Sequence, residues 1–283
     1  MNSNSQPTLS RRNFLAGAAA GLVGLAGAAG LAGCAPSAKS AEGADLAATG
    51  AESALKEPTE TREADIVIVG SGAAGCFAAY EAAKSGAGNI LIVTKSGNAT
   101  DSNFNEITGT ASVETAALKE AGETFTVEDM YQRMINYAHW TVNARLLHEC
   151  VKLLPSNIDI YDEMGVETMV LGDRYNFGFL NVHGFTGKNK GVNFEEGLTA
   201  LGVEFLYDAP ATAILMEDGV ATGVQCESGK DVINVNAKAV LVCTGGYLAN
   251  EEKVAAEYGG CKVVNMGSLN NTGDGERIVL AAG

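Results

Sequence analysis

The sequence has 283 residues, of which 46% are hydrophobic and 19% are charged, and its formal net charge is −15. This length is ample for a buried core and allows one or two domains. The negative charge argues against nucleic acid as a partner, because binding to phosphates relies on clustered Lys and Arg side chains. The six cysteines form neither a CxxC pair nor a CxxCH haem-attachment pattern, so they indicate buried thiols rather than a metal site or covalent haem.

The chain begins with features of an export signal. Residues Ser10–Leu15 read "SRRNFL", a twin-arginine signature, and an uncharged Gly/Ala-rich stretch follows over 16–33. The order and position of these features predict a twin-arginine signal peptide over 1–33. The motif "LAGC", which ends at Cys34, resembles a bacterial lipobox and predicts lipidation of that cysteine. Ordinary cleavage near Ala35 is the alternative.

The predicted signal has consequences for location and cofactor content. The twin-arginine route resembles the pathway that exports proteins already folded, often with a cofactor inserted, so we expect an exported, cofactor-bearing protein. We expect it in the cell envelope, anchored by lipid on the outer face of the cytoplasmic membrane. Residues 34–63 are rich in Ala, Ser, Glu and Thr without hydrophobic periodicity, which predicts a flexible linker before a domain over 64–283.

A βαβ unit opens this domain. The expected strand, glycine-rich turn, helix and second parallel strand occupy 64–69, 70–75, 76–85 and 90–93. The turn reads "GSGAAG" and completes GxGxxG. In this pattern Gly70 permits the tight turn, Gly72 lets the backbone approach a pyrophosphate, and Gly75 allows close packing of helix and strand. The helix N-terminus attracts the phosphate charge, so the unit predicts a dinucleotide site.

The tip of the second strand lacks the acid that often binds a ribose. Thr94 stands there, followed by Lys95. A threonine hydroxyl can still hydrogen-bond a ribose, without the charge assistance of a carboxylate, and the lysine can approach a phosphate. An ordinary strand end with a solvated lysine is the alternative.

The middle of the chain predicts helices. Apolar residues recur at helical spacing between 126 and 165, so we expect a helical insertion over about 124–170. We expect His139 and Trp140 in this stretch to serve packing rather than catalysis. The polar, glycine-rich stretch over 175–193 contains His183, which we expect in a loop.

The last third predicts several short strands and a final helix. The expected strands occupy 202–206, 211–216, 221–226, 232–235 and 237–243, with a hairpin turn at Asp218-Gly219. The last of these strands runs into Thr244-Gly245-Gly246. The segment "NNTGDG" then opens a helix over 276–282.

Three motifs in this order carry a family resemblance: "VIVGSGAAG", "AKAVLVCTGGYLAN" and "NNTGDGERIVLAAG". Together they resemble the FAD-dependent oxidoreductase 2 family, whose members include fumarate reductase and succinate dehydrogenase flavoproteins, over 64–283. The resemblance implies an α/β fold: a Rossmann-like FAD/NAD(P)-binding domain of the glutathione-reductase type with an inserted helical segment. We expect the family's capping or clamp domain to follow the last helix and to be missing from this sequence, which would truncate the domain.

The resemblance also implies roles for individual residues. Pyrophosphate would be held by Gly70, Gly72, Ala74 and Gly75, and the adenosine ribose by Thr94 with Lys95 beside it. Flavin would lie along Ser102, Asn103 and Gly109. The adenine-side crevice would be lined by Thr244, Gly245 and Gly246, and the ribityl chain would be bonded by Asp274. Members with covalent flavin carry histidine at the position of Asn103, so we expect noncovalent FAD.

The activity that the resemblance implies is hydride transfer from flavin N5 to an activated C=C bond of an unsaturated acid. The absence of haem motifs implies a separate electron donor. The family's catalytic residues belong to the clamp, so none is identified here, although Arg174 and His183 are conceivable. A truncated or noncatalytic FAD-binding lipoprotein and an oxidase resembling L-aspartate oxidase are the alternatives.

Overall fold

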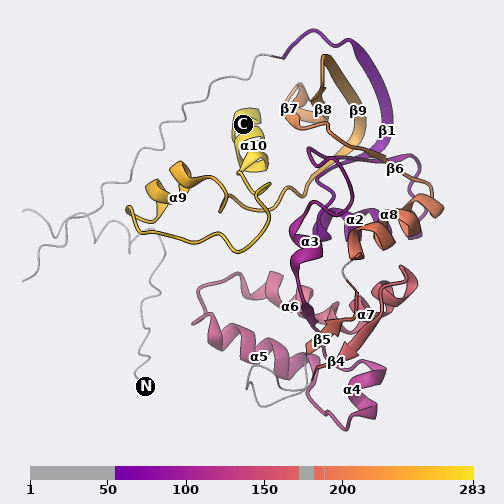
Figure 1. The fold of residues 1–283 in the computed structure, drawn as a ribbon, viewed down its shortest axis with the longest axis vertical. Helices are drawn as coiled ribbons and strands as arrows, with labels where there is room; N and C mark the ends of the chain where they lie inside the picture. Colours follow the sequence, from indigo (N-terminus) through magenta and orange to yellow (C-terminus); the bar gives the residue numbers. More distant parts are fainter. Residues whose placement is uncertain (1–54, 172–181, 188) are drawn as a thin grey trace, which may run out of the picture. The chain divides into compact units, whose positions relative to one another are not determined.

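The computed structural model describes residues 55–171, 182–187 and 189–283 (Figure 1). The predicted signal peptide, Cys34 and most of the predicted linker lie outside these residues, as does Arg174. Within the described part of the chain, no helix is long and apolar enough to cross a membrane.

A six-stranded mixed sheet forms the centre of the domain, with the strand order β6-β2-β1-β9-β8-β7. Its strands are β1 (Glu60–Val69), β2 (Ile90–Val93), β6 (Val203–Leu206), β7 (Ala211–Glu217), β8 (Val220–Ser228) and β9 (Asp231–Val242). Strands β6, β2, β1 and β9 run parallel, whereas β8 pairs antiparallel with both β9 and β7. The predicted α/β fold is confirmed.

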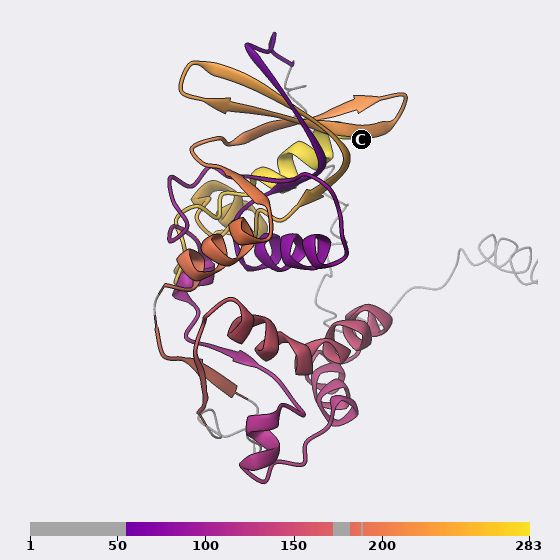
Figure 2. The same cartoon turned by 90° about the vertical axis from the view of Figure 1, so that its right-hand side faces the viewer.

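Both faces of β2 and of the end of β1 are covered, which explains why residues 66–69 and 90–93 are all apolar. Ile68, Ile90 and Ile92 pack against residues of α2 (Ala73–Lys84) and α8 (Lys190–Ala200). On the opposite face, Val67 and Val93 pack in a cluster with residues of β8 and β9 and with Ile278 of α10 (Asp274–Ala282). Figures 1 and 2 show these helices against the sheet. The alternation of side chains along each strand thus builds two cores from one sheet.

Two strands are longer than predicted. Strand β1 begins at Glu60, inside the expected linker, because Glu60–Glu63 pair with Ile233–Asn236 of β9. Strand β9 is continuous from Asp231 to Val242, although two separate strands were expected, because it pairs with β1 along most of its length. The predicted turn is confirmed: Asp218 and Gly219, both with positive φ (50° and 77°), connect β7 to β8.

The predicted helical insertion over about 124–170 contains α5 (Val127–Tyr137), α6 (Ala144–Lys152) and α7 (Leu154–Glu163). Two short helices that were not predicted, α3 (Asn103–Glu106) and α4 (Ala116–Glu120), precede it. A small antiparallel sheet with the order β3-β5-β4 was not predicted; its strands are Gly109–Ala111, Val182–Phe185 and Thr168–Val170. The remaining helix, α9, spans Glu251–Glu257.

His139 and Trp140 were expected to serve packing rather than catalysis, but both side chains are exposed. Both lie in the turn between α5 and α6 with left-handed backbone (φ 50° and 58°), and Trp140 is 62% exposed. Its indole nitrogen donates a hydrogen bond to Asn136 Oδ1 at 3.1 Å. The core of this hairpin is formed instead by Val113, Met130 and Val151.

Candidate functional site

A cavity of about 260 Å³ lies at the carboxyl ends of β1, β2 and β9. Parallel strands that end at the same edge of a sheet place their following turns side by side, which is where α/β folds bind ligands. Here these turns are Gly70–Ala74, Thr94–Ser96 and Thr244-Gly245. Two further segments, within 101–107 and 268–274, also line the cavity, together with Pro210, Ala211 and Ile278.

The glycine-rich turn depends on close backbone approach. Gly70 has φ 109°, and a Cβ atom there would lie 2.5 Å from the carbonyl oxygen of Cys243. A Cβ on Gly75 would lie 1.9 Å from the carbonyl oxygen of Gly70. By contrast, a Cβ on Gly72 would have no described atom within 4 Å, since this residue faces the cavity. Two of the glycines therefore shape the turn and the third leaves room for a ligand.

The N-terminus of α2 gives the cavity a positive electrostatic character. Its N-cap, Gly72, provides no side-chain hydrogen bond, and its first turn contains no acidic residue. The first amides of the helix therefore keep their capacity to bind an anion, and the helix dipole favours negative charge there. This arrangement suits a phosphate group.

Thr94 directly follows β2 and is 5% exposed. Its hydroxyl lies 3.2 Å from Ser71 Oγ in the glycine-rich turn and accepts a hydrogen bond from the amide of Ser96 at 3.3 Å. These bonds connect the turns after β1 and β2. The residue lines the cavity in the place that the sequence predicts for a ribose contact.

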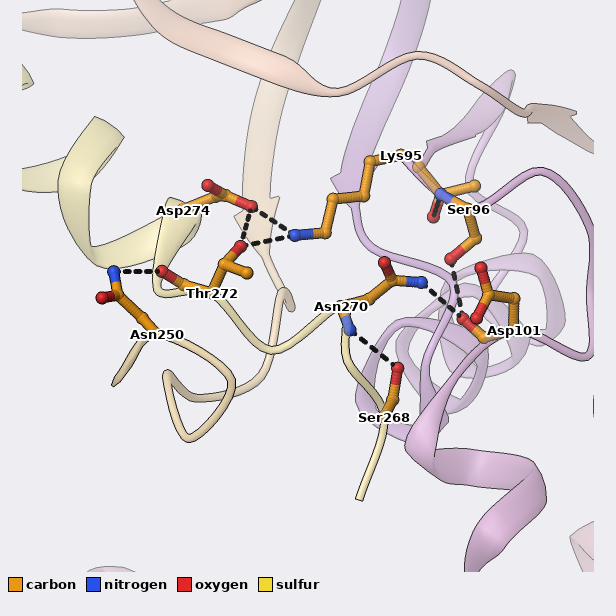
Figure 3. Close-up of polar contacts among 9 residues, drawn as sticks. Lys95, Ser96, Asp101, Asn250, Ser268, Asn270, Thr272 and Asp274 are labelled. Atoms are coloured by element: carbon orange, nitrogen blue, oxygen red, sulfur yellow. Dashed lines mark hydrogen bonds and ion pairs between the residues drawn. The ribbon is translucent and has the colours of Figure 1, made fainter. Parts of the chain in front are cut away.

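Lys95 connects the end of β2 to the start of α10. Its Nζ atom donates to Thr272 Oγ1 and to Asp274 Oδ2, each at 2.6 Å (Figure 3). Burial acts to raise the pKa of Asp274, but the hydrogen bonds from Lys95 and Thr272 outweigh it and hold the pKa below its ordinary value. The carboxylate therefore stays ionised and lines the cavity as a hydrogen-bond acceptor. The alternative, a solvated lysine without a specific partner at position 95, is wrong because Lys95 is bonded to Thr272 and Asp274.

A second set of polar contacts joins the two cavity-lining segments within 101–107 and 268–274. Asn270 Nδ2 donates to the carbonyl oxygen of Asp101 at 3.3 Å, and Ser96 Oγ donates to the same oxygen at 2.8 Å (Figure 3). Asn103 Oδ1 accepts a hydrogen bond from the amide of Ser268. Segments distant in sequence are thereby fixed around one space.

Ser102 has a buried hydroxyl that is unsatisfied within the described part of the chain. It lines the cavity beside Asn103 and Phe104. Buried polar atoms nearly always have a hydrogen-bond partner, and a missing partner calls for a reason such as a ligand. The Ser102 hydroxyl is therefore placed to hydrogen-bond a ligand in this cavity.

The structure brings most of the predicted site residues together. The cavity is lined by Gly70, Gly72, Ala74, Thr94, Lys95, Ser102, Asn103, Thr244, Gly245 and Asp274. The three others do not line it. Gly75 packs inside α2, Gly109 pairs with Gly184 in the small sheet, and Gly246 accepts a hydrogen bond from the amide of Gly273.

Several lining residues were not predicted, among them Asp101, Phe104, Cys243 and Ser268. Asp101 and Phe104 flank the predicted pair 102–103, so their proximity could have been anticipated. Cys243 directly precedes Thr244, and its pKa is raised by burial. Ser268 belongs to a coil segment with no pattern of its own, and only the fold brings it to the cavity.

The histidine candidate lies away from this cavity. His183 is on strand β5 rather than in the expected loop and is fully buried, with its Nε2 atom 3.1 Å from Thr115 Oγ1. Burial lowers its pKa, so the ring is neutral at pH 7. Among the residues described, no group of three or more His, Cys, Asp or Glu side chains could hold a metal ion.

Comparison with known proteins finds a matching family and two similar proteins. The model of the FAD binding domain family matches residues 65–283. A vinyl phenol reductase of Lactiplantibacillus plantarum is 28% identical over 230 residues, which cover 77% of this chain and 45% of that protein. An NADH:fumarate oxidoreductase of Klebsiella pneumoniae is 30% identical over 199 residues, which cover 67% of this chain and 21% of that protein.

A solved structure shares the fold. The open conformation of a flavocytochrome c3 fumarate reductase superimposes with a TM-score of 0.64 at 21% sequence identity, covering 80% of this chain and 41% of that one. This chain therefore spans less than half the length of each of these three proteins.

Proposed function

This chain belongs to the FAD binding domain family and has FAD as its cofactor, and from this premise we propose that it is the cofactor-binding part of a C=C reductase. The substrate class would be an unsaturated acid or a similar conjugated compound. Two relatives support this class of reaction by their names, vinyl phenol reductase and NADH:fumarate oxidoreductase.

The cavity fits FAD through the chemistry of its walls. The free amides at the start of α2 suit a pyrophosphate, and the open space beside Gly72 allows its close approach. The buried Ser102 hydroxyl has no hydrogen-bond partner among the described residues, and a polar atom of FAD can provide one. This unsatisfied hydroxyl within a glycine-rich cavity is the observation that supports FAD binding here, and the class of reaction is supported by the two relatives.

Each wall would then have a distinct part in holding the cofactor. Thr94 would bond the adenosine ribose, and Asp274, held ionised by Lys95, would accept hydrogen bonds from the ribityl hydroxyls. Ser102 and Asn103 would lie along the flavin. Bound FAD supplies hydride transfer. The chain's residues would orient the cofactor, and the start of α2 would bind its pyrophosphate charge. FAD would be held without a covalent bond at Asn103, because the amide of that residue is not a nucleophile.

Electrons would come from a separate donor, because the sequence contains no CxxCH motif for a haem of its own. The substrate would be a small molecule, and contact with a membrane would occur only through an N-terminal lipid. Catalytic residues that contact the substrate are not assigned to any part of this chain.

The first experiment is FAD binding followed by turnover. The protein encoded by the complete open reading frame is purified and loaded with FAD, and a reduced dye is offered with fumarate, urocanate or a cinnamate-like acid. We expect flavin absorbance bands and substrate-dependent oxidation of the dye. Bound FAD without alkene reduction would overturn the reductase proposal in favour of a noncatalytic FAD-binding protein. Amino-acid-dependent peroxide release would instead indicate an oxidase.

We propose export separately, on the sequence motifs "SRRNFL" and "LAGC". Twin-arginine export would be blocked in an Arg11→Lys/Arg12→Lys variant, which should accumulate in the cytoplasm as precursor. Cys34→Ser should be exported and yet fail to incorporate labelled lipid. Lipid incorporation that persists in Cys34→Ser would exclude this cysteine as the anchor.

A further inference from the structure

Lys190 is a buried cation beside the cofactor cavity without being part of it. It is the first residue of α8 and is 2% exposed. Its Nζ atom donates to the carbonyl oxygen of Asn105 at 3.0 Å and lies 4.7 Å from the centroid of the Phe185 ring. Burial lowers its pKa, opposed by the nearby charge of Glu106. Burying an ammonium group is costly unless it is well bonded, so this position calls for a reason.

The bond from Lys190 is one of two described hydrogen bonds that join the start of α8 to the segment after β2, and a third bond holds that segment to itself. Asn105 Oδ1 accepts from the amide of Gly191 at 3.0 Å, and Asn105 Nδ2 donates to the carbonyl oxygen of Ala99 at 3.2 Å. A Cβ on Gly191 would lie 1.9 Å from the same Ala99 oxygen, so only glycine permits this approach. The start of α8 is thus closely attached to residues 99–105.

This attached segment is a wall of the cavity. Ser102, Asn103 and Phe104 line it, whereas Lys190 and Asn105 are not among the lining residues. Helix α3 has only four residues, too few to be stable by itself. Phe104 is anchored by an edge-to-face contact with Phe194 of α8, with 5.0 Å between ring centroids. The conformation of the wall therefore depends on α8.

We propose that Lys190 is a positioning residue for the cofactor. Its ammonium group, bonded to the backbone of Asn105, fixes Ser102–Phe104 in the conformation that receives FAD. The proposal rests on FAD as the cofactor and is independent of which substrate is reduced. Lys190 acts through Asn105 and does not itself touch the cofactor.

The test compares Lys190→Met with a matched control in the full-length chain. Methionine keeps most of the stem volume and removes the donor and the charge. The control is Lys84→Met, which removes an exposed lysine of α2 that is paired with Glu163 of α7 and does not line the cavity. For each variant the dissociation constant of FAD is measured by flavin fluorescence, the environment of bound FAD by visible circular dichroism, and the stability of the apoprotein by thermal unfolding.

We expect Lys190→Met to weaken FAD binding by about tenfold, since a charged hydrogen bond that orders the site is lost. The circular dichroism bands of the remaining bound FAD should change as well. Lys84→Met should leave both properties unchanged. A lower melting temperature of the apoprotein with unaltered FAD affinity and bands would overturn the proposal, because Lys190 would then serve stability alone.

Asn105→Ala keeps the proposal testable if Lys190→Met does not fold. It removes the two side-chain bonds to Gly191 and Ala99, and it should weaken FAD binding in the same direction. In the double variant the two losses should be less than additive, because both act on one wall. Full additivity would contradict a shared mechanism. Failure of the unmodified chain to bind FAD would reject the cofactor itself, which distinguishes that failure from failure of this inference.

Discussion

Lys95 Nζ lies 2.6 Å from Asp274 Oδ2, and this ion pair joins residues 179 positions apart in the sequence. The pair connects the tip of β2 to the first turn of α10, at the edge of the cavity. The side chains are 28% and 34% exposed, so water weakens their attraction and the pair should stabilise the fold by about 1 kcal/mol or less. Its larger effect is to keep a carboxylate ionised where a ligand binds.

The ion pair predicts a pH dependence of stability. The pKa of Asp274 is lower in the folded chain than its ordinary value of 3.8. Its contribution to the free energy of unfolding is therefore present above about pH 3.8 and is lost as the pH falls through the lower folded-state pKa. Denaturant unfolding of the unmodified chain and Asp274→Asn should differ at pH 7, and the difference should shrink in acid. A constant difference would mean that the charge of Asp274 does not stabilise the fold.

Two glycine substitutions should separate folding from cofactor binding. Gly75→Ala places a Cβ atom 1.9 Å from the carbonyl oxygen of Gly70, so we expect it to destabilise the chain by about 3 kcal/mol or more. Gly72→Ala meets no described atom and has φ −75°, so the apoprotein should fold normally and bind FAD at least tenfold more weakly. Thermal unfolding and FAD titration check both. Normal FAD affinity in Gly72→Ala would place the pyrophosphate elsewhere.

Ser102→Ala should have opposite effects on stability and binding. The apoprotein should be as stable as the unmodified chain or more stable by up to about 1 kcal/mol, because an unsatisfied buried hydroxyl is removed. FAD affinity should fall by roughly five- to tenfold if the cofactor is the missing partner. Melting temperatures with and without FAD measure both effects. An apoprotein that loses stability would show that the hydroxyl has a protein partner.

Release of the cofactor tests the role of Asn103. We expect acid precipitation of the loaded protein to leave all FAD in the supernatant, since an amide side chain cannot form the covalent bond. Absorbance of the supernatant and fluorescence of the washed pellet measure the two fractions. Flavin that stays with the pellet would show covalent attachment at another residue.

The central sheet was predictable because its signals are local and consistent. The apolar strand before Gly70, the glycine turn and the alanine-rich helix follow one another within thirty residues or so, and the family pattern fixes their order. Most of the predicted cavity residues lie in such turns. Gly109 is an exception: its place in the small sheet depends on pairing with Gly184, 75 positions later, and no local pattern encodes that contact.

The sequence did not predict which polar side chains are buried in the fold. Lys190 and His183 both lie within the polar, glycine-rich stretch over 175–193, which suggests a solvated loop, and yet both are buried. Trp140 shows the reverse error, since its large apolar ring suggests the core but stands in an exposed turn. Burial is decided by neighbours from other elements, which hydrophobic periodicity cannot identify.

The long pairing between β1 and β9 also has a mechanical consequence. Ahead of β1, the backbone of Lys56 is bonded in both directions to the Gln225 side chain, and at the other end β1 leads directly into Gly70 at the cavity. A pull on the chain before Lys56 therefore loads the parallel ladder in shear, so that many hydrogen bonds resist together rather than opening one by one. The cofactor turn is thereby shielded from tension applied at the N-terminal side.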